Sequence, residues 1–176
     1  MAGAHTNLDS VKALRLQSAR LNMSNLALPP DLKIALESEY LGEIAFMLSY
    51  YLTFDGRKKA LMKALWELEV QTKQRLLAYC RKQGYPVPLS LAARLKGVLY
   101  GLITPALPWK VTIDATLKET DNFLAVFNRL LESATEEDRS LFQYVVDHEI
   151  AIKRFAELES QSPPGDSIAP IQALLD

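Results

Sequence analysis

Four ionisable residues stand in the middle of long amphipathic segments, at positions where the helical period expects apolar side chains. They are Glu43, Glu69, Glu119 and His148. An unpaired charge buried in a helical core is costly, so we expect the four groups to meet and to share protons, hydrogen bonds or a metal ion. His148 is the only histidine inside the predicted fold, because the other one, His5, lies near the N-terminus.

Two kinds of chemistry suit such a centre. Three carboxylates and one imidazole match the ligands of Fe(II) or Mn(II), with coordination positions left open for oxygen. Without a metal, the same groups would form a proton-sharing network in which the carboxylates hold His148 cationic and raise its pKa. Glu149 is an alternative inward-facing residue, but it leaves the apolar face that Val145 and Ile152 define, so we prefer His148.

Helices are expected to position these residues. Leucine, alanine, glutamate, lysine and arginine dominate the long stretches between proline and glycine, and no stretch alternates as a strand does. A last helix is expected to begin at the capping box Ser133-x-x-Glu136 and to end near residue 160. The other predicted helices cover 8–23, 31–54, 57–83, 88–105 and 110–132.

The segments predict an all-α fold, a four-helix bundle with an extra N-terminal helix and an apolar helical insertion between the second and third bundle helices. We expect one domain over 1–176, with the bundle core at about 31–160. The N-terminal helix and its linker occupy 1–30, and a C-terminal strap occupies 161–176.

The composition excludes several functional classes. The net charge of −1 argues against broad nucleic-acid binding. The single cysteine, Cys80, cannot form a disulfide within the chain and favours a reducing compartment; we interpret it as buried filler. Neither a signal-peptide pattern nor an apolar run long enough to span a membrane is visible, so the predicted location is the cytoplasm.

The order of these residues resembles the ferritin-like superfamily, with a layout similar to demethoxyubiquinone hydroxylase and rubrerythrin-type proteins. Four motifs carry the resemblance: EYLGEIAF (39–46) with Glu43, ELEVQTKQRL (67–76) with Glu69, ETDNF (119–123) with Glu119, and VVDHE (145–149) with His148. The resemblance covers about 31–160. It implies that these four residues occupy metal-ligand positions.

The chain departs from the di-iron pattern of that superfamily at three ligand positions. Thr72 and Asn122 stand where histidine is expected, and Val145 stands where a bridging glutamate is expected. With one histidine in the fold, a two-histidine di-iron centre cannot form within one chain. The ligand set is therefore incomplete.

The resemblance implies two functions. The first is a non-catalytic binding or scaffold module with a degenerate di-iron site, for which no cofactor is expected. The alternative is a metal-dependent oxidoreductase or hydroxylase, with one metal or an atypical pair of iron or manganese ions, acting on an apolar or lipid-like substrate. The incomplete ligand set favours the first.

The apolar segment 88–109 suggests contact with another molecule. In the resembling hydroxylases, a similar segment is associated with the membrane surface and a lipid substrate. Here Trp109 would lie at the headgroup level, and an apolar ligand would bind between the segment and the bundle. With only Arg94 and Lys96 as basic residues in the helix, a core-covering helix or a dimer interface is the stronger interpretation. We expect a homodimer, because bundles of this class often pair through apolar helix faces.

Overall fold

The computed structural model describes residues 27–87, 90–161 and 166–175, and in this part of the chain it contains helices and no strand. The all-α prediction is confirmed for these residues, while the helix predicted over 8–23 lies outside them. The elements are α2 (Pro30–Leu52), α3 (Gly56–Gln83), α4 (Leu91–Ile103), the 3₁₀ turn η1 (Thr104–Ala106), α5 (Trp109–Glu132), α6 (Arg139–Glu159) and α7 (Ala169–Leu175).

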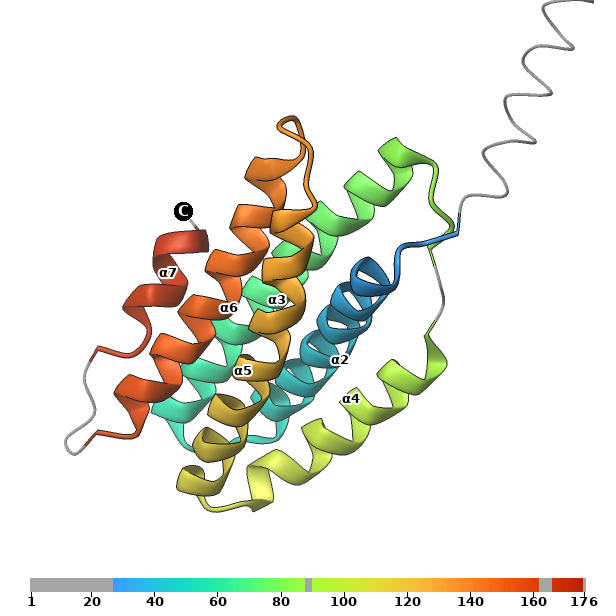
Figure 1. Cartoon of the computed structure of the whole chain (residues 1–176). Coiled ribbons are helices and arrows are strands. Elements are labelled where there is room, and N and C mark those ends of the chain that lie inside the picture. The colour runs from blue at the N-terminus through green and yellow to red at the C-terminus, as the bar shows by residue number, and fades with distance from the viewer. Residues whose placement is uncertain (1–26, 88–89, 162–165, 176) are drawn as a thin grey trace, which may run out of the picture.

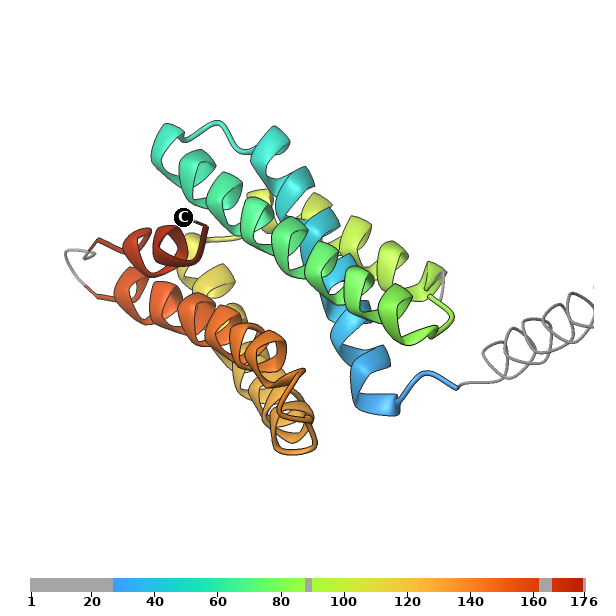
Figure 2. The same cartoon turned by 90° about the horizontal axis from the view of Figure 1, so that it is seen from above.

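The helices form two groups that face each other. In the first group, α2 packs against both α3 and α4; in the second, α6 packs against α5 and α7. Figure 1 shows α4 along the outer side of α2, and Figure 2 shows the two groups from above. Contacts of α2 with α5, and of α3 with α6 and α7, join the groups. The candidate site lies where they meet.

Local signals explain most helix ends. Asp55 caps α3, where its side chain accepts a hydrogen bond from the backbone nitrogen of Lys58 at 2.9 Å, and Gly84 ends that helix with φ of 75°. The predicted capping box before α6 is wrong. Ser133 instead is the C-cap residue of α5, and its hydroxyl donates to the Leu130 carbonyl. A turn follows, and α6 begins only at Arg139.

Helix α4 lies very close to α2 because its inner face carries small residues. A Cβ atom added to Gly97 would lie 2.7 Å from the Leu41 carbonyl oxygen, and one added to Gly101 would lie 2.6 Å from the Leu48 Cβ atom. The outer face of α4 exposes apolar side chains, including Leu91, Leu95, Leu99 and Leu102. In the part of the chain that the structure describes, no helix is long and apolar enough to cross a membrane.

Two apolar clusters lie on either side of the candidate site along the helices. One gathers the N-terminal part of α2 with the C-terminal part of α3 and includes Leu36, Leu76 and Phe127. The other gathers the N-terminal part of α3 with α7 and includes Leu65, Phe155 and Ile171. The polar residues of the site therefore occupy a middle layer, with a hydrophobic core at each end to hold the helices in place.

Glu159 ties the C-terminal segment to the two groups. Its buried carboxylate accepts hydrogen bonds from Arg57 on α3, from Ser167 ahead of α7, and from Trp109 Nε1 at 2.8 Å. The indole nitrogen of Trp109 is thus directed into the protein. That contact argues against the expectation that Trp109 anchors the chain at a membrane headgroup layer.

Replacement of Glu159 by alanine is expected to destabilise the protein by about 2–4 kcal/mol, because it leaves the Trp109 and Ser167 donors without their acceptor. The free energy of unfolding in urea measures this loss. Glu157→Ala is the matched control, since Glu157 pairs with Arg154 at the surface and its loss should cost less than about 1 kcal/mol. Equal losses in the two variants would contradict this role of Glu159.

Candidate metal centre

Three ionisable side chains from three helices meet in the middle layer. Glu39 of α2, Glu69 of α3 and His148 of α6 are 1 %, 5 % and 1 % exposed. His148 Nε2 lies 3.9 Å from Glu39 Oε1 and 3.9 Å from Glu69 Oε1. One ligand atom from each of the three residues lies within 4.8 Å of the others. That spacing allows all three atoms to turn onto a single ion between them.

Thr72 orients the imidazole of His148. The Thr72 hydroxyl donates to the Leu68 carbonyl at 3.0 Å, and its oxygen lies 2.6 Å from His148 Nδ1. Since the one hydroxyl proton is engaged with Leu68, we assign the Nδ1 proton to His148, which donates it to Thr72. The lone pair then lies on Nε2 and faces Glu39 and Glu69. A metal-ligating histidine needs this arrangement, with one nitrogen held by a neighbour and the other free.

Burial keeps the cluster neutral. It raises the pKa of Glu39 well above its ordinary value, with further increases from neighbouring Glu69 and Glu149. Burial also raises the pKa of Glu69 to about 8. A hydrogen bond from Glu39 lowers this pKa, but burial has the larger effect. For Glu149, burial again raises the pKa well above its ordinary value. These carboxyl groups therefore stay protonated at pH values at which an ordinary carboxyl group has ionised.

Burial lowers the pKa of His148 to about 3. The expectation that the carboxylates hold His148 cationic is therefore wrong. The reason is that the neighbouring carboxyls are themselves protonated, so they provide no negative charge to offset the loss of water around the imidazole. The ring is neutral at physiological pH, which is the form that binds a metal.

The structure brings together only two of the four residues predicted for the centre, Glu69 and His148. Glu43 forms an ion pair with Lys73 and remains partly exposed, and it offers no ligand atom to the cluster, although its charge is one of the causes that raise the pKa of Glu69. Glu119 is exposed on α5, although it lines the cavity beside the cluster. At the three divergent ligand positions, Thr72 contacts His148, Val145 is buried among apolar side chains, and Asn122 is exposed.

Two residues of the centre, Glu39 and Glu149, were not selected from the sequence. Glu39 was missed because the predicted apolar face of α2 runs through Leu36, Tyr40 and Glu43. In the structure Leu36 and Tyr40 are buried, but so are Glu39 and Gly42, while Glu43 is not. The spacing of Glu39 from Leu36 and Gly42 was the available signal. Glu149 was set aside in favour of His148. Helix α6, however, packs against neighbours on two sides, so both His148 and Glu149 are buried.

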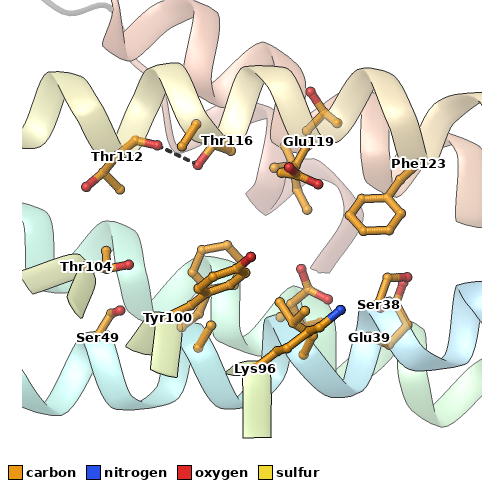
Figure 3. A pocket seen from close by; sticks show the side chains of 18 of the residues that line it. Ser38, Glu39, Ser49, Lys96, Tyr100, Thr104, Thr112, Thr116, Glu119 and Phe123 are labelled. Carbon is orange, nitrogen blue, oxygen red and sulfur yellow. Dashed lines mark hydrogen bonds between the residues drawn. The ribbon is translucent and has the colours of Figure 1, made fainter. Parts of the chain in front are cut away.

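The cluster forms one wall of a cavity of about 530 Å³. Side chains of α2, α4, α5 and α6 line it, together with Glu69 from α3, and most of the lining is apolar. Figure 3 shows α5 residues such as Thr116 and Phe123 on one side, facing Tyr100 and Lys96 of α4 on the other. A cavity of this volume accommodates a small organic molecule.

The donor set fits a metal ion. Glu39 Oε2 is buried and has no hydrogen-bond partner among the described residues, which leaves an oxygen of this carboxyl group with nothing to satisfy it. Glu39, Glu69 and His148 supply two carboxylates and one imidazole, and Glu149 adds a third buried carboxyl that interacts electrostatically with Glu69. Fe(II) and Mn(II) are bound by this combination of ligands.

Gly42 makes room for the Glu69 carboxyl group. A Cβ atom added to Gly42 would lie 2.5 Å from Glu69 Cδ and 2.6 Å from each of its carboxyl oxygens. No side chain at position 42 is compatible with Glu69 in its present place. Glycine is unfavourable in the interior of a helix, so its presence here is explained by the space that the Glu69 carboxyl group needs.

The Gly42→Ala variant is expected to push the Glu69 carboxyl out of the cluster and to weaken metal binding on the order of 10-fold or more, as loss of correct ligand placement does. Isothermal titration with Mn(II) measures the affinity. Gly56→Ala is the matched control, because a Cβ atom there meets nothing within 4 Å. Unchanged Mn(II) affinity in Gly42→Ala would show that Glu69 is not a ligand.

Cys80, the single cysteine of the chain, has no role in this site. Cys80 is fully buried in the apolar cluster that contains Leu36 and Phe127, and burial raises the pKa of its thiol to about 11. A thiol of that kind is unreactive at neutral pH. The interpretation of Cys80 as apolar filler agrees with this position.

Comparison of the chain with models of protein families, with curated proteins and with solved structures gave no match in any of the three.

Proposed function

We propose that this protein is a metal-dependent oxidoreductase that acts on an apolar small molecule, and that α2, α3, α5 and α6 form a ferritin-like four-helix bundle around its centre. The observation that carries the proposal is the position of the Glu39–Glu69–His148 cluster, which opens onto an apolar cavity. This arrangement leads us to favour the metal-dependent alternative over the scaffold that the incomplete ligand set first suggested.

The residues around the centre would divide into metal ligands, a residue that orients a ligand, and apolar residues that hold the substrate. Glu39, Glu69 and His148 would hold the ion, and Thr72 fixes the ring of His148 with Nε2 directed at it. An iron or manganese ion bound there supplies redox chemistry with oxygen. The apolar side chains of the cavity, such as Phe46 and Ile152, exclude water and hold an apolar substrate beside the centre.

A second function has support from a specific observation. Glu39 donates a hydrogen bond to Glu69, and the raised pKa values keep the carboxyls protonated, so the cluster carries no buried charge that an ion must neutralise. A metal-free module that binds an apolar ligand would need nothing more. The cluster would then hold the helices in register and present polar groups to the ligand.

The outer face of α4 is the place where the predicted homodimer or peripheral membrane contact would form. Its exposed leucines give an apolar surface beside the cavity. A membrane contact would bring α4, which lines the cavity through Lys96 and Tyr100, next to a source of apolar molecules, whereas a dimer contact would cover its exposed leucines. Size-exclusion chromatography with light scattering and flotation with liposomes distinguish the two.

Titration of the metal-free protein with Mn(II), followed by electron paramagnetic resonance of the free ion, tests the metal-dependent function. We expect about one bound ion per chain, and the Fe(II)-loaded protein should consume oxygen faster when an apolar substrate is present. Absence of stoichiometric Mn(II) and Fe(II) binding would overturn this proposal and leave the metal-free ligand-binding module in its place.

A further inference from the structure

Two buried hydroxyls in the cavity have no hydrogen-bond partner among the described residues. They are Ser49 Oγ on α2 and Thr112 Oγ1 on α5, and both residues line the cavity. Ser49 is only 1 % exposed. A buried hydroxyl without a partner is unfavourable, and groups of this kind in native proteins usually mark a missing water, ion or ligand.

The neighbouring hydroxyls behave differently. Serine and threonine in helices ordinarily satisfy their hydroxyl by donating to a carbonyl of the preceding turn. Ser38 donates to the Ala35 carbonyl, Thr116 to the Thr112 carbonyl, and Thr120 to the Leu117 carbonyl, and all three donors line the same cavity. Ser49 and Thr112 make no such bond, so both hydroxyls keep their hydrogen-bonding capacity unused beside the cavity.

The two hydroxyls lie at one end of the cavity, away from the centre. Figure 3 shows Ser49, Thr104 and Thr112 together at that end, with Glu39 and Ser38 toward the other. Ser49 follows Glu39 by ten positions on the same helix, which corresponds to about 15 Å at a rise of 1.5 Å per residue. Tyr100 lies between the two ends.

The charges around the cavity decide which oxygen would suit this end. Apart from the phenol of Tyr100, the ionisable side chains of the lining are Lys96, His148 and four carboxyl groups, those of Glu39, Glu69, Glu119 and Glu149. Lys96 and Glu119 lie away from the Ser49 end (Figure 3). The cavity thus offers no positive charge to an anionic group there, and two hydroxyls bind a neutral oxygen well, as donors to a carbonyl or as partners of another hydroxyl.

From these observations the geometry points to a second subsite: Ser49 and Thr112 bind a neutral hydroxyl or carbonyl oxygen of an elongated apolar ligand whose other end reaches the Glu39–Glu69–His148 centre. The inference rests on the proposed function only in that it requires the cavity to receive an apolar ligand. It adds the ligand's chemistry: a neutral alcohol, ketone or ester, with the polar atom roughly 15 Å from the centre.

Calorimetric titration of the full chain with three probes of equal chain length tests the subsite: decan-1-ol, sodium decanoate and decane. We expect the wild type to bind decanol more tightly than decanoate. Ser49→Ala and Thr112→Val should each reduce the decanol affinity about 5-fold, the value of one net hydrogen bond, and leave the decane affinity unchanged or higher. Ser38→Ala is the matched control, because that hydroxyl is already bonded within its own helix.

The outcomes separate the two proposals. If decanol binds the wild type and both variants equally, the subsite is wrong while the cavity remains a ligand site. If decanoate binds as tightly as decanol, the inferred neutrality of the ligand is wrong. If none of the probes binds the wild type, the apolar ligand itself is ruled out, and both the subsite and the proposed function fail.

Discussion

His148→Ala is expected to bind Mn(II) more than about 100-fold more weakly than the wild type. Loss of a residue that merely orients a metal ligand commonly costs 10–100-fold in affinity, so loss of the only nitrogen ligand should cost more. His148 is also the residue that joins α6 to the Glu39 and Glu69 carboxylates of the other helix group. Equilibrium dialysis with metal analysis measures the affinity.

A comparison of two glutamates on helix α2, Glu39 inside the cluster and Glu43 as its control, accompanies this experiment. Glu39→Gln should weaken Mn(II) binding strongly, because Glu39 lies in the cluster. Glu43→Gln should change the affinity far less, because Glu43 is paired with Lys73 and offers no ligand atom to the cluster. The opposite pattern, with loss in Glu43→Gln alone, would restore the ligand set predicted from the sequence and contradict the one drawn from the structure. Circular dichroism confirms that each variant is folded.

The metal-free protein is expected to lose stability as the pH rises from about 6.5 to 8. In the unfolded chain Glu69 ionises near its ordinary pKa of 4.5, whereas burial holds it protonated up to about 8 in the folded protein. Between these values the folded state binds more protons, so stability falls with rising pH, by about 2 kcal/mol over this range from Glu69 alone. Glu39 and Glu149, whose pKa values are also raised, act in the same direction.

His148 acts in the opposite direction over a lower range. Its pKa is about 3 when folded and 6.5 in its ordinary state, so the unfolded chain binds more protons between these values and stability falls as the pH falls. From 4.5 to 6.5 the slopes of Glu69 and His148 cancel, and the alkaline loss above 6.5 is left uncompensated. Urea unfolding as a function of pH measures the profile.

Substitution and metal addition separate the causes of this pH dependence. Glu69→Gln should flatten the loss between pH 6.5 and 8, because an amide does not ionise. Saturating Mn(II) should reverse it, since a metal displaces protons from its ligands and binds more tightly as the pH rises. A wild-type profile that stays flat to pH 8 without metal would show that Glu69 is already ionised in the folded protein.

The sequence predicted the long helices well, and it failed where two helix faces compete. Helices α2, α3, α4 and α5 begin and end within a few residues of their predicted bounds, because proline, glycine and the Asp55 cap act locally. Glu69 and His148 were found because each stands among apolar residues on the buried face of its helix.

Helix phase was the harder problem. The residues of α2 allow more than one apolar face, and α4 packs on a side that local periodicity does not reveal, so Glu39 was passed over for its neighbour Glu43. The same limit applies to the pKa of His148. Its value depends on whether the surrounding carboxyls are charged, which follows from their depth in the protein and from their hydrogen bonds.

The division of the helices into two groups has a consequence for how the protein folds. Contacts between α2 and α3, and between α5 and α6, join neighbouring segments of the chain, so each hairpin closes short loops and is expected to form early. Glu39 and Glu69 come from one hairpin and His148 from the other. The complete ligand set therefore exists only after the hairpins dock, and a bound ion stabilises the docked state alone. Metal binding should then slow unfolding far more than it speeds folding.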